Sequence, residues 1–279
     1  MLARIRAGRA RPRDAEAHVN SLRVFFVGGV MSYRALFNWI NPWVFFPHTL
    51  GYPIFEILFF AYLGRFAGVE SDKFFLIGNA FMAIAITGFF GMGSSIGGER
   101  RSQTLSTLLA SPANRLALFL GRAVPSIVTG FLVAATAFAI CSLILGVHFS
   151  ASELAGLAVA ALVASFACTS FGLCLGCLGL RGRSVSLFAD MVGGTMLLVS
   201  GANVPFDRLP SAVQAVGRCL PLTHGIAAGR ELGAGASLAS VSGLLGTEAL
   251  VGCVYLVLGV VMLRVFEFQG RRAATLETF

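Results

Sequence analysis

Several apolar runs of bilayer-spanning length constrain this chain more than any other feature. They cover roughly residues 43–63, 74–96, 124–145, 154–180, 185–202 and 244–263. A helix needs about 20 apolar residues to cross the hydrocarbon core. Backbone groups in lipid must be satisfied internally, so spanning segments are helices or closed barrels, and continuous rather than alternating apolar residues favour helices. The runs therefore predict an all-α membrane protein with six transmembrane helices.

The charge distribution predicts the orientation of these spans. Charged residues make up only 12% of the chain, and the formal net charge is +8. Most lysines and arginines fall in the two terminal segments and in the loops after spans two and four, whereas the opposite side carries Arg65, Lys73, Arg208, Arg218 and Arg230. Basic residues concentrate in cytoplasmic loops. We therefore expect both termini in the cytoplasm and no nucleic-acid partner.

The chain divides into a membrane domain and two short cytoplasmic ends. Residues 1–42 combine an Arg-rich tail with an aromatic, amphipathic stretch that contains Arg23 and Arg34, which is typical of an interfacial helix in contact with membrane lipid. Residues 43–268 form the six-helix domain, and residues 269–279 form the second tail. Pro47 and Pro53 predict a kinked or broken start of the first span.

A polar segment at residues 99–112 separates spans two and three. Glu99 stands at its front, where a helix dipole favours an acid, and Leu105, Leu108 and Leu109 give one apolar helical face. We expect Gly97 and Gly98 to break the preceding helix and Pro112 to end this one. The segment is a cytoplasmic helix that a partner can push, or an ordinary interfacial linker.

Residues 203–242 lie between the last two spans. Prolines divide this segment, yet its apolar residues keep a helical spacing. We predict two short re-entrant or lid-like helices on the extracytoplasmic side, which are tolerated where protein buries them. A solvated loop is the alternative.

Three local patterns together resemble the membrane-spanning subunit of bacterial ABC-2 type exporters. They are Asn41-Pro42 before the first span, the Glu99-Arg100 to Ser111-Pro112 segment, and the proline-rich region from Val204 to Leu232. The resemblance implies a homodimer, or a pair with a related permease, that binds a cytoplasmic ABC ATPase. It also implies a bacterial cytoplasmic (inner) membrane location, with the 99–112 coupling helix and the N-terminal helix seated on the ATPase.

The resemblance assigns two groups of residues. Those expected to couple to the ATPase are Glu99, Arg100, Arg101, Thr104, Leu105, Leu108, Leu109, Pro112, Arg23 and Arg34. Those expected at the extracytoplasmic gate are Pro205, Leu209, Pro210, Pro221, Thr223, His224 and Arg230.

The chain carries no nucleotide-binding motif of its own. No GxxxxGK[ST] pattern is present, so ATP and Mg²⁺ are expected only through the partner subunit, and the chain itself is not expected to be an enzyme. The sequence shows no pattern typical of a catalytic triad, of paired catalytic carboxylates or of a set of metal ligands. Cys174 and Cys177 have the CxxC spacing, but no second pair accompanies them, so we interpret them as small residues packed between helices.

Glu56 and Asp190 are acids that fall inside the apolar runs. An ionised Glu56 within a span costs about 2.5–3.5 kcal/mol on insertion scales, which indicates either a substrate-pathway or proton-sensitive group or a structural hydrogen bond. Phe55, Phe59 and Phe89 are candidates for the same pathway. We interpret Asp190 as satisfied by Arg181 or Arg183 near the cytoplasmic end of the fifth span.

The leading hypothesis is the permease subunit of an ATP-driven exporter. Its expected cargo is an amphipathic or hydrophobic drug, secondary metabolite or lipid-linked molecule, as in multidrug efflux. The alternative is a proton-coupled secondary transporter that uses Glu56, and a membrane scaffold or enzyme is third.

Overall fold

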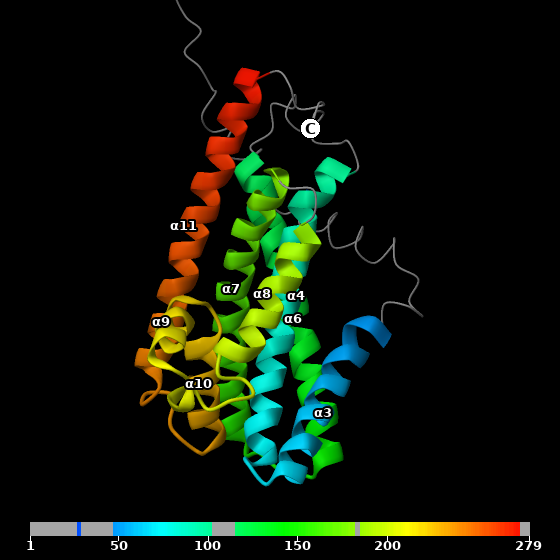
Figure 1. Cartoon of the computed structure of the whole chain (residues 1–279), viewed down its shortest axis with the longest axis vertical. Coiled ribbons are helices and arrows are strands. Elements are labelled where there is room, and N and C mark those ends of the chain that lie inside the picture. The colour runs from blue at the N-terminus through cyan, green and yellow to red at the C-terminus, as the bar shows by residue number, and fades with distance from the viewer. Residues whose placement is uncertain (1–26, 29–46, 102–114, 182–184, 274–279) are drawn as a thin grey trace, which may run out of the picture.

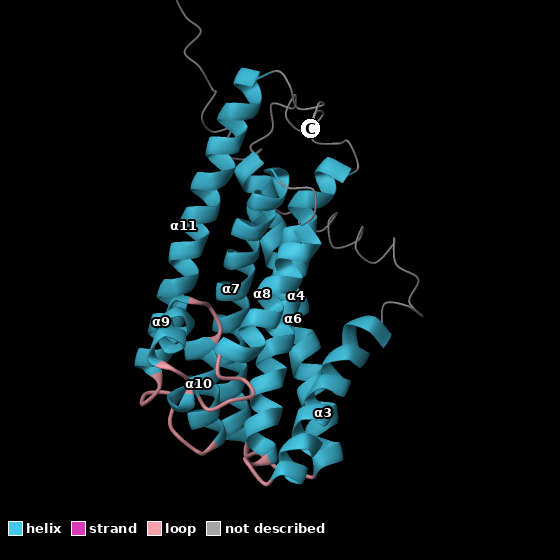
Figure 2. Cartoon of the chain, in the orientation of Figure 1, coloured by secondary structure: helices cyan, strands magenta, loops and turns pink. Residues whose placement is uncertain are grey.

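The fold is a bundle of long helices in a computed structural model that describes residues 27–28, 47–101, 115–181 and 185–273 (Figure 1). All regular structure in these ranges is helical (Figure 2). The elements are the π-helical turn η1 (Pro47–Gly51), α3 (Tyr52–Ala67), α4 (Asp72–Arg101), α6 (Arg115–Leu145), α7 (Ala151–Arg181), α8 (Val185–Val199), the 3-10 turn η2 (Phe206–Arg208), α9 (Ser211–Cys219), α10 (Thr223–Gly233) and α11 (Ser242–Ala273).

Five helices are long and apolar enough to cross a membrane, which confirms the all-α membrane class. They span residues 49–67, 72–93, 120–145, 151–178 and 242–266. The remaining predicted span, the fifth along the chain, is the shorter helix α8, whose apolar part covers Ala189–Val199. It ends at Val199 rather than Ala202, because the chain turns at Gly201, whose φ of +82° is a left-handed value that suits glycine.

Helices α4 and α7 form the centre of the bundle. In the membrane-spanning parts of α4 and α7, 72% and 61% of the residues are buried, against 22% in α3 and 11% in α11. Glycine permits the close approach, since a Cβ on Gly172 would overlap the backbone of Gly88. Gly172 is therefore a small residue at a close contact between two helices.

Two predictions about helix ends had different outcomes. The broken start of the first span is confirmed, because η1 precedes α3 and Pro53 lies in the first turn of α3, where proline is tolerated. The predicted break at Gly97 and Gly98 is wrong, because α4 continues through both to Arg101. Glycine costs only about 1 kcal/mol in a helix interior, less than leaving backbone groups unpaired near lipid.

Residues 206–233 form a unit that we call the α9–α10 cap. It consists of η2, α9 and α10 and confirms the prediction of two short helices in this region. The cap lies at the end of the bundle opposite the C-terminal end of α11 (Figure 1). Helix α10 is largely buried, with Ile226, Ala228 and Leu232 in the main core, whereas most of α9 is exposed.

Candidate functional site

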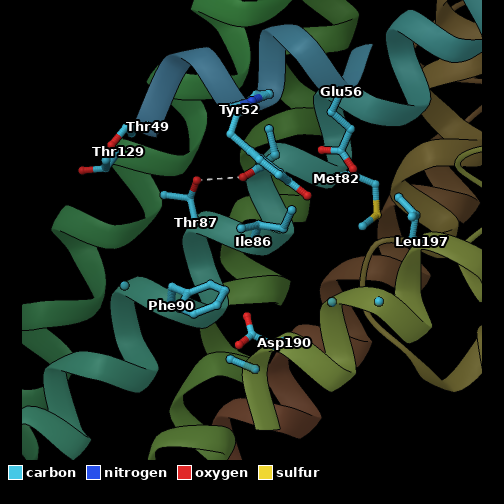
Figure 3. Close-up of a pocket in the computed structure, with 16 residues that line it drawn as sticks. Thr49, Tyr52, Glu56, Met82, Ile86, Thr87, Phe90, Thr129, Asp190 and Leu197 are labelled. Carbon is cyan, nitrogen blue, oxygen red and sulfur yellow. Dashed lines mark hydrogen bonds between the residues drawn. The ribbon is translucent and has the colours of Figure 1, made fainter. Parts of the chain in front are cut away.

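A cavity of about 600 Å³ lies between α3, α4, α6 and α8 (Figure 3). Helix α3 and η1 supply one wall and α8 supplies the facing wall, while α4 lies between them. The lining residues are Thr49, Tyr52, Pro53, Glu56, Met82, Ala83, Ile86, Thr87, Phe90, Gly91, Thr129, Ala189, Asp190, Gly193, Gly194 and Leu197. Its size is typical of small-molecule sites, which measure about 300–1,000 Å³.

Glu56 reaches the cavity from the second turn of α3. Its side chain points toward Met82 of α4 (Figure 3). Its Oε2 atom is buried and has no hydrogen-bond partner within the described part of the chain. The sequence left open that Glu56 makes a structural hydrogen bond to a neighbouring helix, but Oε2 makes none with the described residues. A buried carboxylate oxygen without a partner is energetically costly.

Asp190 reaches the same cavity from α8, and its side chain is exposed. The sequence interpretation paired Asp190 with Arg181 or Arg183, whose side chains lie outside the described residues. Tyr52 is 55% exposed, so the cavity is open to the surroundings on the α3 side. The fold thus places two acids that are far apart in the sequence on the lining of one cavity.

The three phenylalanines proposed for the pathway lie elsewhere. Phe55 and Phe59 are 76% and 62% exposed on the outer face of α3, and neither lines the cavity. Phe89 is fully buried and stacks edge-to-face on Phe171 of α7, with 5.3 Å between ring centroids. Among the described aromatic residues, Tyr52 and Phe90 line the cavity.

Arg230 connects the α9–α10 cap to the bundle. Its guanidinium lies 3.4 Å from the ring centroid of Phe74 and donates a hydrogen bond of 2.8 Å to the carbonyl of Ala202. Burial lowers the pKa of Arg230 to about 10. The group is a buried cation whose stacking and hydrogen bond offset its lost hydration.

The other predicted gate residues mark the ends of the short helices. Pro205 and Pro210 precede η2 and α9, and Leu209 follows η2. Pro221 lies between α9 and α10, and Thr223 begins α10 and is buried. His224 is partly exposed, and its Nε2 lies 3.2 Å from the carbonyl oxygen of Arg218.

Glu248 of α11 is a buried acid that the sequence reasoning missed. It is fully buried and accepts hydrogen bonds from the backbone N–H of Leu222 at 2.6 Å and of Gly225 at 3.0 Å. The first turn of α10 has no cap from its own Leu222, so Glu248 supplies the missing acceptor. An acid inside the last apolar run was the available signal, and it is the same signal that identified Glu56.

The predicted coupling residues fall at the edge of the described chain. Glu99, Arg100 and Arg101 form the backbone of the last turn of α4, and their side chains lie outside the described residues. The remaining coupling residues lie outside them entirely: Thr104, Leu105, Leu108, Leu109, Pro112, Arg23 and Arg34. Their coupling role stays a prediction.

The CxxC pair contacts the adjacent helix α11. The Cys174 thiol lies 3.1 Å from the carbonyl of Tyr255, and that of Cys177 lies 3.7 Å from the carbonyl of Gly259. Among the described residues no group of three or more His, Cys, Asp or Glu side chains is arranged to hold a metal ion.

Comparison with known proteins gives the family. No curated protein matches the sequence. The family model described as ABC-2 type transporter matches residues 29–232, more than half of the chain, and the matched region contains η1 to α10, the cavity and most of the α9–α10 cap. The chain therefore belongs to the ABC-2 type transporter family and is a multi-pass membrane subunit of an ABC transporter.

Proposed function

We propose that the chain is the permease of an ATP-driven exporter and moves an amphipathic or hydrophobic molecule across the bacterial cytoplasmic membrane. The observation that carries this proposal is the cavity of about 600 Å³ lined by helices of the ABC-2 domain. It combines apolar walls with a few polar groups, as small-molecule sites do. The cargo binds there and leaves past the α9–α10 cap.

Energy for the transport cycle comes from a separate subunit. The sequence has no P-loop, so a cytoplasmic ABC ATPase binds ATP and Mg²⁺ and closes on them. Residues 99–112 and the N-terminal interfacial helix receive that motion. The permease works as a homodimer or with a related permease, with both termini in the cytoplasm.

The test is the ATPase activity of the chain co-expressed with its candidate ATPase. Changing Glu99→Ala together with Arg100→Ala is expected to remove cargo-stimulated hydrolysis, because the pair begins the coupling segment. Glu267→Ala with Arg271→Ala removes the same two charges near the C-terminus of α11 and serves as the matched control. If the ATPase never co-purifies with the chain, the proposal is wrong.

One observation favours the second candidate, a proton-coupled transporter. Glu56 has a buried oxygen without a partner, which suits a group that takes up and releases a proton. This alternative predicts transport in vesicles that contain a proton gradient but no ATPase subunit and no ATP. Transport that requires ATP and the partner subunit excludes it.

A further inference from the structure

The charged side chains that line the cavity in the described part of the chain have one sign. Glu56 and Asp190 line it from facing helices, and no lysine, arginine or histidine is among the described lining residues. The other polar side chains among the described lining residues are four neutral hydroxyls, on Thr49, Tyr52, Thr87 and Thr129. An anionic molecule that entered this cavity would meet two carboxylates and no counter-charge, so the cavity selects against anions.

The carboxylate of Glu56 lacks the counter-charge that a buried acid needs. Its Oε2 is buried without a hydrogen-bond partner in the part of the chain that the structure describes. A buried charge is favoured by a nearby counter-charge. No basic group of the described chain lines the cavity, so a cation bound there would supply the counter-charge that the ionised form of Glu56 lacks.

The remaining walls indicate what carries that positive charge. Met82, Ile86 and Leu197 present apolar surface to the cavity, and the ring of Tyr52 provides a π-face to which organic cations are attracted. A small inorganic cation would gain nothing from these contacts and would lose its hydration. A volume of about 600 Å³ instead accommodates a bulky organic ion.

We propose that this cavity binds a lipophilic organic cation, with its charge attracted by the carboxylates of Glu56 and Asp190 and its apolar body against Met82, Ile86 and Leu197. That the bound cation is cargo rests on the proposed exporter function. The binding itself does not, because every group that makes it belongs to this chain.

The test compares two ions of nearly equal size and shape but opposite charge. Radiolabelled tetraphenylphosphonium and tetraphenylborate are titrated onto the full chain in nanodiscs of phosphatidylcholine, which has no net charge. Uptake by the lipid, which the bilayer dipole potential makes larger for the anion, is measured separately for each ion on empty nanodiscs. We expect the cation to bind at least about tenfold more tightly than the anion after subtraction of empty nanodiscs. Equal binding of the two ions overturns the proposal without any variant.

Two conservative variants test whether the carboxylates in the cavity bind the cation. Glu56→Gln and Asp190→Asn keep the shape of each side chain and remove its charge, and each is expected to weaken cation binding by about 3- to 10-fold, with the double variant abolishing the preference for the cation. Matched controls are Glu231→Gln and Asp207→Asn, which remove exposed acids outside the cavity and are expected to bind as the unchanged chain does.

The outcomes separate this proposal from the proposed function. If both cavity variants fold, as judged by gel filtration, and bind the cation as the unchanged chain does, the assignment to Glu56 and Asp190 is wrong even when the ATPase couples. If cation binding follows the carboxylates but no ATPase associates, the cavity assignment stands and the ATP-driven function fails.

Discussion

Replacement of Glu248 is expected to loosen the α9–α10 cap at one defined point. The carboxylate is fully buried and accepts the N–H groups of Leu222 and Gly225, which begin α10. Leu222 has a φ of +90°, a left-handed conformation that costs a non-glycine residue about 1–2 kcal/mol. The two hydrogen bonds hold the backbone in this conformation, so their loss favours opening of this turn.

The magnitude follows from the number of bonds lost. Hydrogen bonds to charged groups contribute about 1.5–3 kcal/mol each. In Glu248→Gln the amide keeps one acceptor oxygen and turns an NH₂ group toward the second N–H, so about 1.5–3 kcal/mol is lost. Glu248→Ala loses both bonds, about 3–6 kcal/mol. Since about 1.4 kcal/mol is a factor of ten, Glu248→Gln should raise the local opening constant roughly 10- to 100-fold.

Amide hydrogen exchange followed by mass spectrometry measures this opening directly. Exchange of protected amides reports the free energy of local opening, and a peptide covering residues 220–228 contains both bonded N–H groups. Glu231→Gln, on the exposed face of the same helix, is the matched control and is expected to leave exchange unchanged. Exchange in Glu248→Gln within twofold of the unchanged chain would refute the reasoning.

Three further predictions follow from the packing and the charges. Gly172→Leu forces α7 away from the α4 backbone and should lower the free energy of unfolding, measured by denaturant titration, by at least about 1–3 kcal/mol. The matched control is Gly246→Ala, which should leave stability unchanged because Gly246 has open space around it. Asp72→Asn breaks the ion pair with Arg65. Because that pair is exposed and solvent screens its charges, the loss in the free energy of unfolding should stay below about 1 kcal/mol. A larger loss in the same titration would contradict this screening. The pKa of Arg230 in the folded protein is lowered to about 10, so above about pH 10 unfolding takes up a proton and this residue makes the free energy of unfolding rise with pH. Between pH 6 and 9 Arg230 is protonated in both the folded and the unfolded state and should add no pH dependence. A difference between the unchanged chain and Arg230→Gln in the slope of stability against pH in that lower range would contradict this prediction.

The sequence predicted the elements whose signals are local. Apolar runs of sufficient length define spans because lipid offers the backbone no hydrogen-bond partner, and this requirement acts on each segment separately. The broken start at Pro47 and the two short helices of the cap followed from prolines, whose effect is also local. Glu56 was identified for the same reason, as one acid in one apolar run.

Only the tertiary structure decided which distant groups meet. Asp190 shares a cavity with Glu56, and Glu248 caps helix α10 through the N–H of Leu222, the residue before that helix and 26 residues earlier in the chain. Neither partnership leaves a periodic pattern in one segment, because each depends on how helices from different parts of the chain pack. The continuation of α4 through Gly97 has the same cause: a weak local preference for breaking yields to the hydrogen bonds of a long helix.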